Sequence, residues 1–324
     1  MIKQLTSIPW LGVLLPGVFL AMLLLIGLFV PFGPILILLS PVLLAYQMVT
    51  EGLARTAAVI LSAAIILSLV LSVPVALCLV AFSALPGLSM GRTMQKQAGF
   101  LTGLGASSIG FVLAVSLSVG IYFFLSGQSP LLAFQEILEL SRQSAMELAR
   151  QFGQTADQVH KLGEQLKVMA ETLLRIFPFL VVSMAVASSF LCYWFTAGVL
   201  NRAGRRVPAI PPFAHWRFPP AIVLGYAVGF VLVFWRDSTV LAGLYPLGLN
   251  LYLFFTLMFS IQGFSYFYYL MTKLGFPKPI RVVLVFWALL IPLLDQASVW
   301  LGMLDMALDL RNFRLPWRRD NGQK

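Results

Sequence analysis

The sequence predicts an all-α protein: a polytopic bundle of transmembrane helices with an amphipathic helical hairpin outside the membrane. Of its 324 residues, 60% are hydrophobic and 10% are charged, against about 25% charged in a soluble domain. Several apolar runs reach the roughly 20 residues that a helix needs to cross the hydrocarbon core. None of them shows the alternation typical of a β-barrel strand. These features exclude a soluble enzyme, a secreted disulfide scaffold and a disordered regulator.

Eight or nine membrane spans are expected from these runs. The residues that they cover are 8–30, 35–48, 57–90, 100–125, 177–200, 219–235, 239–271 and 282–304. The third run is long enough for two short spans and is broken near Pro74, because proline interrupts helix hydrogen bonding. The last run contains Pro292 and Asp295 near its middle. It is either a full crossing or a re-entrant hairpin that returns the chain to the same side, and we favour the hairpin.

Residues 129–175 differ from the rest, because they carry eleven charged residues and still keep a helical pattern. Apolar residues recur there in heptads and form a narrow stripe. Gly153 and the capping-box pattern Thr155-x-x-Gln158 predict a helix end and a new start. A helical hairpin is therefore expected, with one continuous bent helix as the alternative.

The segments divide the chain into four parts. These are five spans in residues 1–127, the amphipathic insertion in 128–176, the C-terminal spans in 177–310 and a basic tail in 311–324.

The positive charges predict the orientation. If the N-terminus is cytoplasmic, the short opposite loops hold only Arg236. The cytoplasmic loops then hold Lys3, Arg55, Arg92, Lys96, Arg202, Arg205, Arg206, Arg217, Lys273, Lys278 and Arg281. This asymmetry follows the positive-inside rule and puts the amphipathic hairpin outside. The net charge of +10 then reflects contacts with anionic lipid headgroups and not nucleic acid.

Motifs for catalysis and for cofactors fail on inspection. The stretch from Gly87 to Thr93 is one residue short of a phosphate-binding loop and has Arg92 in place of the lysine. The two histidines, His160 and His215, have no Cys or acidic partners at metal-ligand spacing. We therefore predict that the chain is not an enzyme and holds neither a metal nor a cofactor.

Three polar residues inside the apolar runs are candidate ligand-binding residues: Asn250, Gln262 and Asp295. Each is costly in lipid and should face protein or a cavity. Asn250 and Gln262 fit interhelical hydrogen bonding as well as ligand contact. For Asp295, three solutions are open: a re-entrant turn exposed to water, a protonated carboxyl, or a hydrogen bond to Asn250 or Gln262.

Small residues at four-residue spacing form stripes, among them Gly17-x-x-x-Ala21 in the first span and Ala106, Gly110 and Ala114 in the fifth. Such stripes let helix backbones approach closely. They serve either internal packing or the docking of a partner membrane protein.

The N-terminal half has a proline-led second span at Ser40-Pro41 and the motif Leu85-Pro86-Gly87-Leu88-Ser89-Met90-Gly91-Arg92. In these features it resembles the substrate-capture subunits of energy-coupling-factor vitamin transporters. This likeness implies a related helical fold and a coupling membrane subunit with ATPases as partners. Three later apolar stretches and the amphipathic insertion depart from those compact subunits.

The C-terminal third contains a set of short motifs: Asn250-Leu251, Gln262-Gly263, Lys273-Leu274-Gly275-Phe276-Pro277, Ile280-Arg281, Gly302-Met303-Leu304-Asp305 and Asp309-Leu310-Arg311. In these residues it resembles the YybS-like family of uncharacterised bacterial membrane proteins. The resemblance implies a multi-pass protein of the bacterial inner membrane and implies no substrate.

Two functions fit these observations. The first is a membrane-embedded capture or transport component for a small, partly apolar metabolite, which lacks its own ATPase. The second is a cell-envelope scaffold that docks envelope proteins through residues 129–175.

Overall fold

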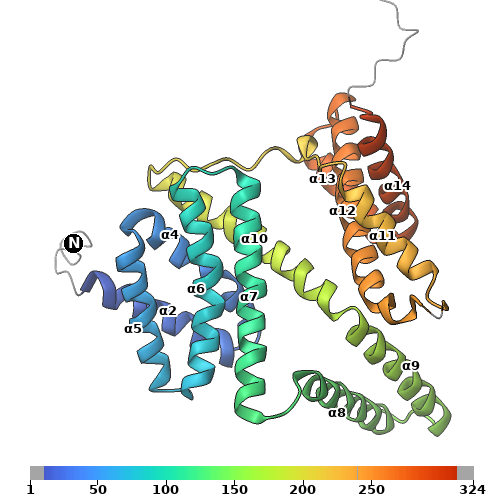
Figure 1. The fold of residues 1–324 in the computed structure, drawn as a ribbon, viewed down its shortest axis with the longest axis horizontal. Coiled ribbons are helices and arrows are strands. Elements are labelled where there is room, and N and C mark those ends of the chain that lie inside the picture. Colours follow the sequence, from blue (N-terminus) through green and yellow to red (C-terminus); the bar gives the residue numbers. More distant parts are fainter. Residues whose placement is uncertain (1–10, 239, 312–324) are drawn as a thin grey trace, which may run out of the picture. The chain divides into compact units, whose positions relative to one another are not determined.

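The computed structural model describes residues 11–238 and 240–311, and over these residues the chain is helical and contains no strand (Figure 1). This confirms the predicted all-α class. The start of the first span, Lys3 and the basic tail from residue 312 lie outside the described residues.

The first nine described helices cover the chain up to Arg202 and are labelled as in Figure 1. Their bounds are α2 Leu11–Phe29, α3 Pro34–Leu39, α4 Pro41–Glu51, α5 Leu53–Ser68, α6 Val73–Gln95, α7 Phe100–Ser126, α8 Pro130–Gln151, α9 Ala156–Arg175 and α10 Phe177–Arg202. Proline occupies the first turn of α3, α4, α6 and α8, where its missing N–H costs no helix hydrogen bond. The predicted break near Pro74 is the turn between α5 and α6.

The remaining elements follow a proline-rich segment. They are the 3₁₀ turns η1 Phe213–His215 and η2 Ala242–Leu244, and the helices α11 Ile222–Phe234, α12 Tyr245–Lys273, α13 Lys278–Leu290 and α14 Pro292–Leu308.

The chain forms two compact units. One comprises Met1–Leu174 with Leu180–Ile210, and the other comprises Arg175–Phe179 with Pro211–Lys324. Most of α10 therefore belongs to the first unit, although the sequence-based division placed it among the C-terminal spans. That division describes the order of the segments along the chain and not the compact units.

Six described helices are long and apolar enough to cross a membrane: Leu11–Phe29, Pro34–Glu51, Val73–Gln95, Phe100–Ser126, Phe177–Arg202 and Tyr245–Lys273. The helices α13 and α14 pass the same test only as a pair, bent by 106° at Ile291 between them. The helices α5 and α11 are apolar but have 16 and 13 residues. Six membrane spans are thus supported by the length and composition of the described helices. The eight or nine spans expected from the sequence stay a prediction.

Residues 129–175 form two helices and not one continuous helix. Gly153 adopts a left-handed φ of 77° between them. The N–H of Thr155 donates to Oε1 of Gln158 at 2.9 Å, and the N–H of Gln158 donates to Oγ1 of Thr155 at 3.4 Å. This is the predicted capping box. Ala149 of α8 and Val159 of α9 are buried, and the side of the membrane on which these helices lie stays a prediction.

Candidate functional site

The three predicted polar residues all lie in the second unit, but the structure places them at separate positions. Asn250, in the second turn of α12, uses its amide to bridge the junction between α9 and α10. Its Oδ1 accepts from the N–H of Phe179 at 2.7 Å, and its Nδ2 donates to the carbonyls of Arg175 at 2.8 Å and Pro246 at 2.7 Å. Backbone groups at helix ends lack helical partners, so Asn250 satisfies them by interhelical hydrogen bonding.

Gln262 lies in the buried interior of the second unit, and its side chain is 2% exposed. Its Oε1 accepts from the N–H of Phe218 at 3.1 Å, and its Nε2 donates to Oδ2 of Asp305 at 2.6 Å. The amide therefore ties the segment after η1 and the end of α14 to α12.

Asp305 and Arg311 form a buried ion pair. Neither residue was predicted to be a site residue from the sequence. Nε of Arg311 donates to Oδ2 of Asp305 at 3.0 Å, with the two side chains 4% and 2% exposed. The other guanidinium nitrogens donate to Oγ of Ser265 at 3.1 Å and to the carbonyl of Ala214. Oδ1 of Asp305 is buried without a hydrogen-bond partner among the described residues. The sequence offered one signal for this ion pair. An acidic and a basic residue lie six positions apart at the end of the last apolar run.

Asp295 faces protein from the first turn of α14. Its Oδ1 accepts from Oγ of Ser260 at 2.7 Å, and Oγ of Ser298 donates to the Asp295 carbonyl at 2.6 Å. The partner of the Asp295 side chain is thus Ser260. The hydrogen bond to Asn250 or Gln262 that the sequence analysis considered does not form.

The two ends of the α13–α14 pair meet the same end of α12. The Arg281 guanidinium, in the first turn of α13, lies 4.8 Å from the centroid of the Tyr268 ring. The Arg311 guanidinium, just after α14, lies 5.9 Å from the ring of Tyr266 and 5.7 Å from that of Tyr269. Asp295, near the bend, instead contacts α12 at Ser260. The pair therefore folds back as a hairpin beside α12, and its re-entry in the membrane stays a prediction.

Two glycines allow this hairpin to lie directly on α12. A Cβ at Gly263 would stand 1.8 Å from the carbonyl oxygen of Ser298, and one at Gly302 would stand 2.0 Å from that of Phe259. Any larger residue would separate the backbones of α12 and α14.

The small-residue stripes lie against neighbouring helices of the first unit. A Cβ at Gly17 would stand 1.9 Å from Oγ of Ser62 on α5, and Ala21 is 1% exposed. A Cβ at Gly110 would stand 2.7 Å from Cα of Pro86 on α6. Ala114 is fully buried and Ala106 is half-buried. These placements are those that internal packing requires, and partner docking stays a prediction.

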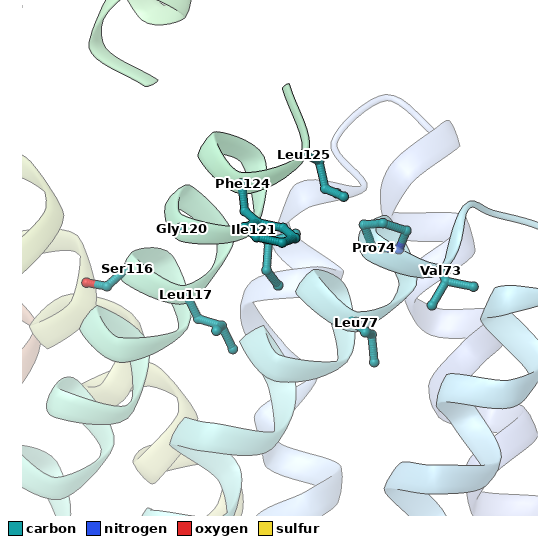
Figure 2. A pocket seen from close by; sticks show the side chains of 9 residues that line it. All are labelled: Val73, Pro74, Leu77, Ser116, Leu117, Gly120, Ile121, Phe124 and Leu125. Carbon is teal, nitrogen blue, oxygen red and sulfur yellow. The ribbon is translucent and has the colours of Figure 1, made fainter. Parts of the chain in front are cut away.

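A pocket of about 460 Å³ opens between the first turns of α6 and the last turns of α7. Figure 2 shows its lining, which is Val73, Pro74 and Leu77 from α6, and Ser116, Leu117, Gly120, Ile121, Phe124 and Leu125 from α7. A Cβ added at Gly120 would meet nothing within 4 Å. The missing side chain of Gly120 therefore leaves room in the pocket.

The chain resembles an uncharacterized relative and matches a family model of predicted membrane proteins. It is 28% identical, over 239 residues, to the uncharacterized protein YybS of Bacillus subtilis (strain 168), and the match covers 72% of this chain and 75% of that protein. No solved structure gives a significant match. A family model described as "Predicted membrane protein (DUF2232)" matches residues 18–306. Because this match covers most of the chain, the protein belongs to the DUF2232 family of predicted membrane proteins.

Proposed function

We propose that the protein is a membrane-embedded capture or transport component for a small, largely apolar compound. The observation that carries this proposal is the pocket between α6 and α7. Its volume of about 460 Å³ falls within the range of roughly 300–1,000 Å³ that is typical of small-molecule sites.

The lining of the pocket determines the class of compound. Ser116 is its one polar side chain, and its hydroxyl donates to the carbonyl of Val112 at 2.9 Å. A strongly polar metabolite would lose its hydration there without gaining hydrogen bonds. Phe124, Ile121 and Leu77 instead offer apolar and aromatic contact surface.

The position of the pocket suggests the route of entry. It lies at the end of the α6–α7 pair opposite to Arg92 and Lys96. With these two residues in the cytoplasm, as the charge asymmetry predicts, the pocket opens at the outer leaflet. The chain has no ATP-binding motif, so transport would require a separate coupling subunit with ATPases or an ion gradient.

Filling the pocket tests this proposal. Gly120→Leu places a side chain in the pocket without a backbone clash, and Gly105→Leu on the same helix is the matched control, because a Cβ at Gly105 also meets nothing within 4 Å. Each protein is extracted with its native lipid, and the organic extract is analysed by mass spectrometry. We expect a compound that co-purifies with the wild type and Gly105→Leu and is lost from Gly120→Leu. Identical extracts from all three proteins would contradict the proposal.

An envelope scaffold is the second candidate function, because α8 and α9 expose apolar side chains. The exposed large apolar residues of this segment are Leu131, Leu132, Ile137, Leu140, Leu148, Phe152, Val168 and Met169. An exposed apolar stripe on a charged helix is typical of a helix that binds a partner or lies on a membrane surface.

One pair of variants separates the two functions. Leu140→Ser with Leu148→Ser removes part of the α8 stripe, whereas Gly120→Leu leaves it intact. If the protein is a scaffold, the serine variant loses a co-purifying envelope protein and Gly120→Leu keeps it. If it is a capture component, the serine variant keeps its bound compound.

A further inference from the structure

A second groove combines an apolar lining with one charged side chain. It has a volume of about 340 Å³ and lies between α6 and α7, where Leu85, Leu88 and Arg92 face Ala106, Ile109 and Leu113. One apolar residue each from α4 and α5 completes it. Arg92 is the one charged residue in this lining.

The charge stands at one end of the groove. Arg92 lies in the last turn of α6. There the two helices are paired at Thr93 and Gly103, since a Cβ at Gly103 would stand 3.2 Å from Oγ1 of Thr93. At the other end, Gly110 lies against Leu85 and Pro86. Seven residues separate Arg92 from Leu85, which corresponds to about 10 Å along a helix. The groove thus runs from a guanidinium at the water boundary toward the apolar middle of the helices.

The Arg92 side chain is available for a ligand. It is exposed and takes part in no ion pair or hydrogen bond among the residues that the structure describes. Arg55, at the neighbouring start of α5, is by contrast paired with Glu51. A guanidinium presents parallel N–H donors that match the oxygens of a phosphate group.

We propose that this groove binds a phospholipid with an anionic headgroup. The phosphate lies on Arg92, and the first part of an acyl chain lies along Leu88, Ala106 and Ile109. Charge complementarity supports this occupant, because Arg92 lies in the last turn of α6 at the water boundary, and a basic membrane boundary attracts anionic lipid. The apolar floor distinguishes a lipid from a soluble phosphate, which would have no contact with it.

The test is lipid retention by the full-length protein. The protein is reconstituted in vesicles of phosphatidylcholine and phosphatidylglycerol, extracted in mild detergent and examined by native mass spectrometry for bound lipid. We expect the wild type to retain phosphatidylglycerol in preference to phosphatidylcholine. Arg92→Gln should weaken this retention by about tenfold, the effect of losing one charge-assisted phosphate contact.

Lys96→Gln is the matched control, because it removes the same charge one turn further along, outside the groove. It should leave retention within about twofold of the wild type, a change of under 1 kcal/mol in binding. Equal losses in both variants, or no loss in either, would overturn the proposal, since the attraction would then be general or absent.

A second pair of variants tests the apolar half of the groove. Ala106→Phe fills the groove and should also lower retention of phosphatidylglycerol, whereas Gly105→Phe next to it points to open space and should not. Inorganic phosphate, added in place of the lipid, should not raise the unfolding temperature. If phosphate stabilises the protein as much as phosphatidylglycerol does, or if Ala106→Phe retains lipid normally, the acyl-chain contact is wrong.

Discussion

Arg311 donates a hydrogen bond from Nε to Oδ2 of Asp305 at 3.0 Å, and both side chains are almost wholly buried. Between them the backbone of Asp309 adopts a left-handed φ of 46°, which turns the chain back after α14. The pair also reaches α12 through Ser265 and the segment of η1 through Ala214. It therefore fixes the end of the α13–α14 hairpin to the rest of the second unit.

Breaking this pair on one side should destabilise the protein strongly. Asp305→Leu leaves the Arg311 guanidinium buried without its carboxylate, a change that typically costs about 3–5 kcal/mol. The double variant Asp305→Leu/Arg311→Met removes both charges and should regain much of that loss. Unfolding of the purified protein by sodium dodecyl sulfate measures these differences.

Arg217 supplies the control for this comparison. Its ion pair with Asp309 has a length of 2.9 Å, but the side chains are 44% and 52% exposed. Exposed pairs contribute about 0–1 kcal/mol, so Arg217→Gln should lie within that range. If Asp305→Leu were as mild as Arg217→Gln, the buried pair would not hold the hairpin in place.

Gly110→Leu should disrupt the contact between α6 and α7. A Cβ at this position already stands 2.8 Å from the carbonyl oxygen of Leu85, so a leucine side chain forces the backbones apart. We expect loss of the monodisperse folded peak in size-exclusion chromatography, while Gly105→Leu keeps it. A folded Gly110→Leu protein that loses a co-purifying partner would instead indicate docking.

The orientation can be tested by cysteine labelling. In a background with Cys78→Ser and Cys192→Ala, Thr155→Cys should react with an impermeant maleimide added outside, and Arg205→Cys only after the membrane is opened. The reason is the asymmetry of basic residues between the two sets of loops. Labelling of position 155 from the cytoplasm alone would reverse the whole topology.

Asp295 can be replaced in two ways that separate its hydrogen bond from its charge. Asp295→Asn keeps an oxygen that can accept from Ser260 and should keep the folded yield. Asp295→Leu leaves the Ser260 hydroxyl without this acceptor and should cost about 1–3 kcal/mol. If Asp295→Asn folds normally but no longer binds the compound, the charge itself has a role. If Asp295→Leu changes neither folding nor binding, Asp295 is not a site residue.

Glu139 predicts a local dependence on pH in α8. The Arg142 guanidinium donates to its carboxylate at 2.6 and 2.8 Å. This contact, with a smaller contribution from Gln143, lowers the pKa of Glu139 from 4.5 to about 2. Because the folded-state pKa is depressed, the stabilisation is present above pH 4.5 and is lost as the pH falls toward 2. Carbon-13 NMR of the glutamate carboxyl groups should show one late titration that Arg142→Gln returns to the ordinary range, and an ordinary midpoint in the wild type would refute the contact.

The helices could be predicted from the sequence because their signals are local. Apolar runs of sufficient length predicted the membrane helices, and Pro74 predicted the break between α5 and α6. The Thr155-x-x-Gln158 pattern predicted the start of α9, since a capping box involves four consecutive residues. Pro292 and Asp295 inside one apolar run predicted a bend, which the structure places at Ile291.

The partners of the buried polar groups were decided by the tertiary structure alone. Asn250 could be recognised from the sequence as a costly group in lipid, but two of its three partners lie more than 70 positions away at the junction of α9 and α10. Gln262 and Asp305 meet only because Gly263 and Gly302 let two helix backbones touch. Hydropathy depends on each residue and its neighbours, so it determined which segments are helical and apolar. The pairing of charges depends on which helix faces meet, and the fold of the hairpin onto α12 determined that.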